Sequence, residues 1–281
     1  MGILLNDATG KLRSGWVIFV FAALAGFSYF VGSAAVAILG LEPRSPLSLD
    51  DVRLFFTTAV MLAAAGFASL ICALALKAEV GLPRHRALSH TLVGLGLGAA
   101  VVTLAVVIPV AAGHGTLHLY AGPLGALALA AATHALILVP TSIGEELLLR
   151  GVVMRQLALG TRPWLAVALT GSAFGVMHLL NPSASPIAAL NVALVGLWFG
   201  VLAIRTSLWT SIAAHASWNW FEGFVLGQPV SGINPGTSLF AGTVQTSGFF
   251  SGGDFGPEAS GLTTVLLALA TIAAAAWPKK P

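Results

Sequence analysis

Two adjacent carboxylates and an arginine stand out in a chain in which only 8% of the 281 residues are charged. They are Glu145, Glu146 and Arg150, with apolar sequence on both sides. A charge at membrane depth costs about 3 kcal/mol, so such residues are usually paired and functional. Glu146 and Arg150 have the favourable i,i+4 order for an ion pair on a helix, and Glu145 points about 100° away. One glutamate can therefore be neutralised while the other is available for chemistry; a salt bridge at the membrane surface is the alternative.

Further polar groups lie in two later apolar segments. His178 follows Phe174 by four residues, and His215 precedes Asn219 by four. The spacing of His215 and Asn219 puts both on one helix face. Packing alone does not easily explain acid, imidazole and amide groups in three apolar segments.

Such a set predicts hydrolysis. A carboxylate and a histidine, here Glu145 and His178, can deprotonate a water between them. His215 and Asn219 can donate hydrogen bonds to the oxyanion of a tetrahedral intermediate. Together they would cleave an amide without a covalent intermediate.

Three of the same side chains could instead bind a zinc ion. Glu145, His178 and His215 would make a two-histidine, one-carboxylate site with an open position for water. The HExxH signature of many zinc proteases is not in the sequence. We favour a mechanism without a cofactor, because Asn219 suits an oxyanion and is an uncommon zinc ligand; zinc stays the alternative.

Eight apolar runs must position these groups. The chain is 57% hydrophobic, and the runs are near the length of about 20 residues that a bilayer requires. They do not alternate, which favours helices over a barrel. The sequence thus predicts an all-α polytopic membrane protein, a bundle of about eight transmembrane helices forming a single domain over 1–281. The runs are 16–41, 54–76, 91–112, 123–160, 163–180, 187–204, 208–227 and 262–277.

Basic residues predict the orientation in the membrane. If the runs alternate in direction, most basic residues between them fall on one side, and the positive-inside rule makes that side cytoplasmic. Both termini are then cytoplasmic, and we expect a cell-membrane protein. The net charge of +3 comes without a dense basic cluster, so we expect no nucleic-acid partner. The residues on the cytoplasmic side are Lys11, Arg13, Lys77, Arg84, Arg86, Arg155, Arg162, Arg205, Lys279 and Lys280, and those on the other side are Arg44 and Arg53.

The depth of each candidate residue in the membrane follows from the number of residues between it and the nearest turn. Glu145 and His178 each lie about sixteen residues from the turn at Thr161 and Arg162, so antiparallel helices place them at one level. His215 lies only about eight residues from its own cytoplasmic turn and is expected to be shallower. Helix tilt could reconcile the two depths.

Three other features are interpreted without a catalytic role. His134 is expected to be a hydrogen-bonded packing residue. Glu222 is expected to be solvated near the outer end of its helix. The Gly/Ser-rich segment at about 228–261 is an extracytoplasmic loop whose phenylalanines are expected to pack on the bundle.

Taken together, the motifs resemble a family. Glu145-Glu146…Arg150, Phe174…His178 and His215…Asn219, in this order, resemble the CAAX-protease and bacteriocin-processing (CPBP, or Abi) intramembrane endopeptidases. The resemblance covers about 123–226, the expected protease core, and more faintly Ser251–Glu258. It implies that the first glutamate acts as base with the histidine of the second motif, and that the third motif stabilises the oxyanion. It also implies a buried cavity open toward the cytoplasm.

We therefore predict an intramembrane endopeptidase with Glu145, His178, His215 and Asn219 as catalytic residues and Glu146 and Arg150 in support. Its partners would be the lipid bilayer and a peptide or protein substrate, with a CAAX-like C-terminus or of bacterial origin, lipidated or not. The alternative is a non-proteolytic membrane protein, either a proton-coupled transporter or an immunity or scaffold protein. The sequence does not indicate the oligomeric state.

Overall fold

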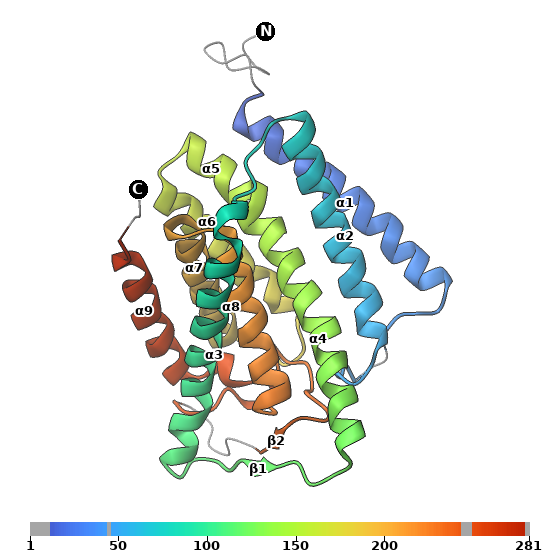
Figure 1. The fold of residues 1–281 in the computed structure, drawn as a ribbon, viewed down its shortest axis with the longest axis vertical. Coiled ribbons are helices and arrows are strands. Elements are labelled where there is room, and N and C mark those ends of the chain that lie inside the picture. The colour runs from blue at the N-terminus through green and yellow to red at the C-terminus, as the bar shows by residue number, and fades with distance from the viewer. Residues whose placement is uncertain (1–11, 44–45, 243–248, 279–281) are drawn as a thin grey trace.

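A computed structural model describes residues 12–43, 46–242 and 249–278. The chain forms a bundle of long helices, and the start of α1 and the end of α9 lie at the same, upper end of the view (Figure 1). The helices are α1 (Ser14–Ile38), α2 (Arg53–Ala75), α3 (Ala87–Ala111), α4 (Leu124–Glu146), α5 (Met154–Gly160), α6 (Pro163–Met177), α7 (Pro186–Arg205), α8 (Leu208–Trp220) and α9 (Gly261–Ala276).

Shorter helical turns extend or join these helices. The π-helix η2 (Leu147–Val153) links α4 to α5, and the π-helix η4 (Phe221–Val225) continues α8. The 3₁₀ turns are η1 (Arg84–Arg86), η3 (His178–Leu180), η5 (Gly253–Phe255) and η6 (Pro257–Ala259). Two short strands, β1 (His118–Leu119) and β2 (Phe240–Ala241), pair antiparallel at the lower end of the bundle (Figure 1).

Each of the eight predicted runs corresponds to a helical segment, so the prediction of an all-α polytopic membrane protein is confirmed. Six segments of the described chain are long and apolar enough to cross a membrane, and the longest covers Leu124–Gly160 over 37 residues. Many large apolar side chains on α1, α2 and α3 are exposed, as lipid-facing helices require. Among the residues used to predict orientation, Lys11, Arg44, Lys279 and Lys280 lie outside the described residues.

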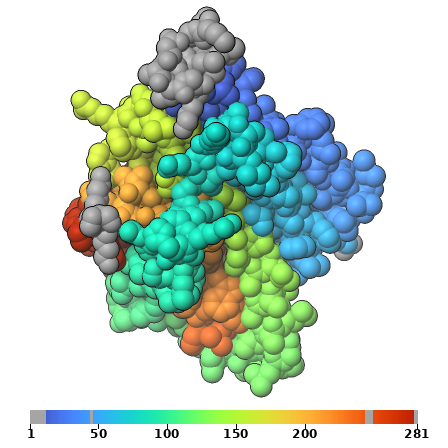
Figure 2. Space-filling view, turned by 45° about the horizontal axis from the view of Figure 1, so that its top comes forward, coloured from blue at the N-terminus to red at the C-terminus, as the bar shows by residue number. Residues whose placement is uncertain are grey.

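Small residues allow the inner helices to approach closely. On α3, a Cβ at Gly94 would lie 2.4 Å from the carbonyl oxygen of Thr210, and a Cβ at Gly98 would lie 2.0 Å from that of Ala214. Membrane helices pack through such small residues, because lipid provides little hydrophobic drive for association. α3 packs against α8, which carries two of the predicted site residues, and in the space-filling view the teal surface of α3 and the segment before it borders the orange surface (Figure 2).

Candidate active site

A cavity of about 110 Å³ lies inside the bundle, and all four predicted catalytic residues line it. Glu145 comes from α4, His178 from η3 at the end of α6, and His215 and Asn219 from α8. Apolar side chains complete much of the wall, including those of Phe174 and other residues of α2, α4, α7 and α8. The three sequence motifs therefore meet in one enclosed space.

His215 lies between the two glutamates. Its Nδ1 is 3.2 Å from Oε1 of Glu146, and its Nε2 is 3.5 Å from Oε2 of Glu145. The ring stacks on Phe199, with centroids 4.8 Å apart, and meets the edge of Phe174. Carboxylates only accept hydrogen bonds, so His215 can donate to both glutamates only as an imidazolium. The histidine that directly contacts Glu145 in this structure is thus His215, and the joint action of Glu145 and His178 on a water between them stays a prediction.

Glu146 and Arg150 form the expected i,i+4 ion pair. Nη1 of Arg150 is 2.7 Å from Oε1 of Glu146, and both side chains are fully buried. Glu146 also accepts a 2.6 Å hydrogen bond from the hydroxyl of Ser211, and Nη2 of Arg150 donates to the carbonyl oxygen of Gly196. Because Ser211 of α8 and Arg150 both donate hydrogen bonds to Glu146, its carboxylate is held in place and fixes the orientation of His215.

His178 and Asn219 reach the cavity from different elements, η3 and α8. Nδ1 of His178 is 2.9 Å from the carbonyl oxygen of Phe174. A carbonyl only accepts, so Nδ1 carries the proton, and Nε2 of the neutral ring has a free lone pair. Nδ2 of Asn219 donates to the hydroxyl of Ser142 at 3.3 Å. The geometry gives His178 a basic nitrogen and Asn219 an N–H group at the cavity.

The depth of His215 follows from where α8 begins. The backbone N–H of Leu208 donates to the carbonyl oxygen of Gly81 at 3.0 Å. Gly81 in turn lies against the guanidinium of Arg155. The turn before α8 is therefore level with Arg155, about ten residues from Glu145, and not with Gly160. The expectation that His215 would be shallower than Glu145 is wrong, because the helix of Glu145 extends beyond the start of α8.

The sequence did not indicate the two π-helical segments. One begins directly after Glu146 and contains Arg150, and the other begins two residues after Asn219. π-Helical turns are uncommon and frequently lie at functional sites. Helical periodicity would not reveal them, because these helices are apolar on most sides and have little pattern for an inserted residue to interrupt.

The loop after α8 also contributes to the cavity, a role that the sequence had not assigned. Ser231 and Glu258 both line it. Burial raises the pKa of the Glu258 carboxyl; hydrogen bonds from Ser231 and the nearby His178 act in the opposite direction. Phe255 of the same loop is buried, as expected, although Phe249 is half exposed.

Glu222 and His134 are two further polar residues that are buried in the bundle. Glu222 is fully buried, and its Oε2 accepts a 2.9 Å hydrogen bond from Nε1 of Trp218, so the expectation of a solvated residue is wrong. His134 is buried with its ring nitrogens 2.8 Å and 2.7 Å from the carbonyl oxygens of Ala130 and Pro235. This agrees with a hydrogen-bonded packing residue.

The cavity residues do not form an assembled three-ligand zinc site in this arrangement. Within residues 12–43, 46–242 and 249–278, no three His, Cys, Asp or Glu side chains are grouped as metal ligands. Both nitrogens of His215 already face carboxylates. The 3.5 Å between Nε2 of His215 and Oε2 of Glu145 is compatible with two ligands of one zinc ion, so zinc stays the alternative.

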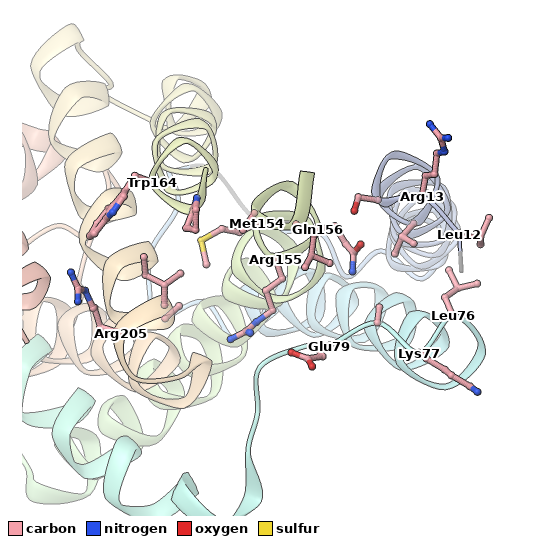
Figure 3. A pocket seen from close by; sticks show the side chains of 18 of the residues that line it. Leu12, Arg13, Leu76, Lys77, Glu79, Met154, Arg155, Gln156, Trp164 and Arg205 are labelled. Carbon is pink, nitrogen blue, oxygen red and sulfur yellow. The ribbon is translucent and has the colours of Figure 1, made fainter. Parts of the chain in front are cut away.

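A larger cavity of about 940 Å³ lies at the upper end of the bundle, between α1, α5, α6 and α7. Its charged residues include Glu79, Arg155 and Arg205, with Arg155 near Glu79 and Arg205 beside Trp164 (Figure 3). Lys77 points away from the other labelled side chains (Figure 3). None of the motif residues lines this cavity, so its size does not make it the candidate active site.

Comparison with known proteins agrees with the motifs. Residues 125–221 match the family model described as type II CAAX prenyl endopeptidase Rce1-like. No curated protein and no solved structure matched the chain. The matched segment runs from the start of α4 to the end of α8 and includes all six predicted site residues. The segment of this multi-pass membrane protein that supplies all six predicted site residues is therefore similar to the Rce1-like type II CAAX prenyl endopeptidases.

Proposed function

We propose that the chain is an intramembrane endopeptidase that hydrolyses a peptide bond with a water activated by Glu145 and His178. The observation that carries this proposal is the meeting of Glu145, His178, His215 and Asn219 in one buried cavity. A substrate carbonyl in this cavity would be within reach of a base and of hydrogen-bond donors at once. Such positioning is what general-base hydrolysis requires.

In the proposed mechanism, Glu145 takes a proton from the water while Nε2 of His178 orients it. The water oxygen bonds to the substrate carbonyl carbon, and negative charge develops on the carbonyl oxygen. The amide N–H of Asn219 stabilises that charge, and Nε2–H of His215 joins it once Glu145, protonated by the water, no longer attracts it. Glu146, held by Arg150 and Ser211, keeps His215 in place. No cofactor takes part in this scheme.

The substrate we propose is a peptide or protein segment that enters from the membrane or its surface. The family points to a CAAX-like C-terminus, lipidated or not, and a bacterial peptide or protein substrate is the other option. We place the protein in the cell membrane with both termini in the cytoplasm, on the distribution of basic residues.

Reporter peptides test the proposal. Purified protein in lipid vesicles would be given prenylated and unprenylated peptides with a CAAX-like C-terminus, with Glu145→Gln and Glu79→Gln measured beside the wild type. Glu79 lines the other cavity and is the matched control. We expect cleavage by the wild type and Glu79→Gln and a loss of at least about 100-fold in Glu145→Gln. Full activity in Glu145→Gln would overturn the proposal, and the peptide that is cleaved identifies the substrate class.

A further inference from the structure

Glu258 is a cavity carboxylate that the mechanism above does not use. It lies on η6, just before α9, and is almost completely buried. Asn191 of α7 holds this segment in place, since its Nδ2 donates to the carbonyl oxygens of Glu258 and Ser260 at 2.7 Å and 2.8 Å. Burying a carboxyl group is unfavourable unless hydrogen bonds or partners compensate it, and this carboxyl group is held in the wall of the cavity that contains the predicted catalytic residues.

Ser231 fixes the direction of the carboxyl group. Both its backbone N–H and its hydroxyl donate to Oε2 of Glu258, at 2.8 Å and 2.6 Å. Ser231 has φ 47°, a left-handed conformation that residues other than glycine seldom adopt. Strain of this kind tends to persist where it serves a site. With Oε2 occupied twice, Oε1 is the oxygen left to face the cavity.

The surroundings of Glu258 favour a group that can hold and release a proton. His178 and His215 on the cavity side interact with it electrostatically. Glu222 of η4 is a second buried carboxyl that also interacts with it. Two neighbouring carboxyl groups do not readily ionise together, and burial favours the neutral form. The proton of a neutral Glu258 would lie on Oε1, because Oε2 accepts both bonds from Ser231.

Amide hydrolysis needs such a group. An amine leaves a tetrahedral intermediate only when its nitrogen is protonated. Glu145, once protonated by the water, is one carboxyl that could supply this proton, and Glu258 is a second carboxyl in the cavity wall. We propose that Glu258 is the proton donor to the leaving amine, a fifth catalytic residue supplied by the loop. This inference rests on the proposed function.

The proposed step balances as follows. The C–N bond of the intermediate breaks, its electron pair stays on nitrogen, and the nitrogen takes the proton from Oε1 of Glu258. The oxyanion re-forms the carbonyl of the acid product. Glu145 then holds the proton from water, and its transfer back to Glu258 through His178 or solvent restores the starting state.

A comparison of leaving groups tests this role. One acyl sequence would be presented as a peptide and as an activated aryl ester, whose phenolate leaves without protonation. We expect Glu258→Gln to lower kcat/KM for the peptide by at least about 100-fold, and for the ester by less than about 10-fold. Glutamine keeps the acceptor for Ser231 but cannot donate a proton as an acid. Asp254→Asn, an exposed residue of the same loop, is the control and should change neither rate.

Each outcome distinguishes the roles. Equal losses on both substrates would mean that Glu258 only supports the structure, and no loss on either would mean that it has no role; both overturn the inference. Glu145→Gln should lose both activities, and if it retains both, the proposed function itself fails.

The wild type gives a second test that does not depend on a folded variant. The donor acts while protonated, so peptide cleavage should fall as the pH rises through its pKa. That pKa lies above the ordinary glutamate value, because burial raises it. Glu145, His178, His215 and Glu222 affect both substrates alike, so the ratio of peptide cleavage to ester cleavage should fall as the pH rises. A ratio that does not change with pH would contradict the inference.

Discussion

Replacing Arg150 by methionine tests the buried ion pair most severely. Arg150 donates to Glu146 at 2.7 Å and to the carbonyl oxygen of Gly196 at 3.0 Å, and its guanidinium lies 4.6 Å from the ring centroid of Phe174. Methionine fills much of the same space without charge. Glu146 would then be fully buried with no cation beside it except His215.

Breaking one partner of a buried pair costs about 3–5 kcal/mol, because the other charge stays uncompensated. Even the lower figure reduces the folding equilibrium constant more than about 100-fold. The double variant Glu146→Gln with Arg150→Met should recover a large part of this loss, since neither charge remains. Glutamine also keeps an oxygen that can accept from His215.

Reversible unfolding in detergent, followed by circular dichroism, measures these effects. Arg162→Met is the control, because Arg162 is exposed at the start of α6, and it should change stability by less than about 0.5 kcal/mol. A loss below about 1 kcal/mol in Arg150→Met would refute the reasoning. So would a double variant less stable than Arg150→Met alone.

Two further predictions concern the packing around α8. Gly98→Ala should destabilise the protein by about 1–3 kcal/mol and lower hydrolysis, because its Cβ would meet the carbonyl oxygen of Ala214 at 2.0 Å. Gly96→Ala on the same helix, with open space around it, should be neutral, and equal melting temperatures for the two variants would contradict this packing. Ser211→Ala removes a 2.6 Å hydrogen bond to Glu146 and should cost about 1.5–3 kcal/mol by thermal unfolding; an unchanged melting temperature would count against that bond.

The helices could be predicted closely from the sequence, and their relative depths could not. Apolar runs and their flanking turns indicate each helical segment, because a bilayer demands length and uniform hydrophobicity. Residue counting from the turns placed Glu145 and His178 together but separated His215. The hydrogen bond from Leu208 to Gly81 decides that depth, and such a long-range contact leaves no trace in local periodicity.

The candidate site, like the fold, could be predicted from the sequence only in part. Spacing alone predicted the Glu146–Arg150 pair, since four residues bring side chains together on one helix. The contact between His215 and both glutamates depends on how α4 and α8 pack. Ser231 and Glu258 belong to a segment without helical pattern, so only the fold reveals that they face the cavity. The assigned roles of the site residues stay predictions.

The central claim is that Glu145 activates water without a metal, and hydrolysis by metal-depleted protein tests it most directly. Purified protein would be treated with a strong zinc chelator, and peptide cleavage would be compared with that of untreated protein and of Glu145→Gln. We predict unchanged cleavage after chelation and a loss of at least about 100-fold in Glu145→Gln. Activity that is lost to the chelator and restored by zinc would contradict the account and make His178 and His215 ligands.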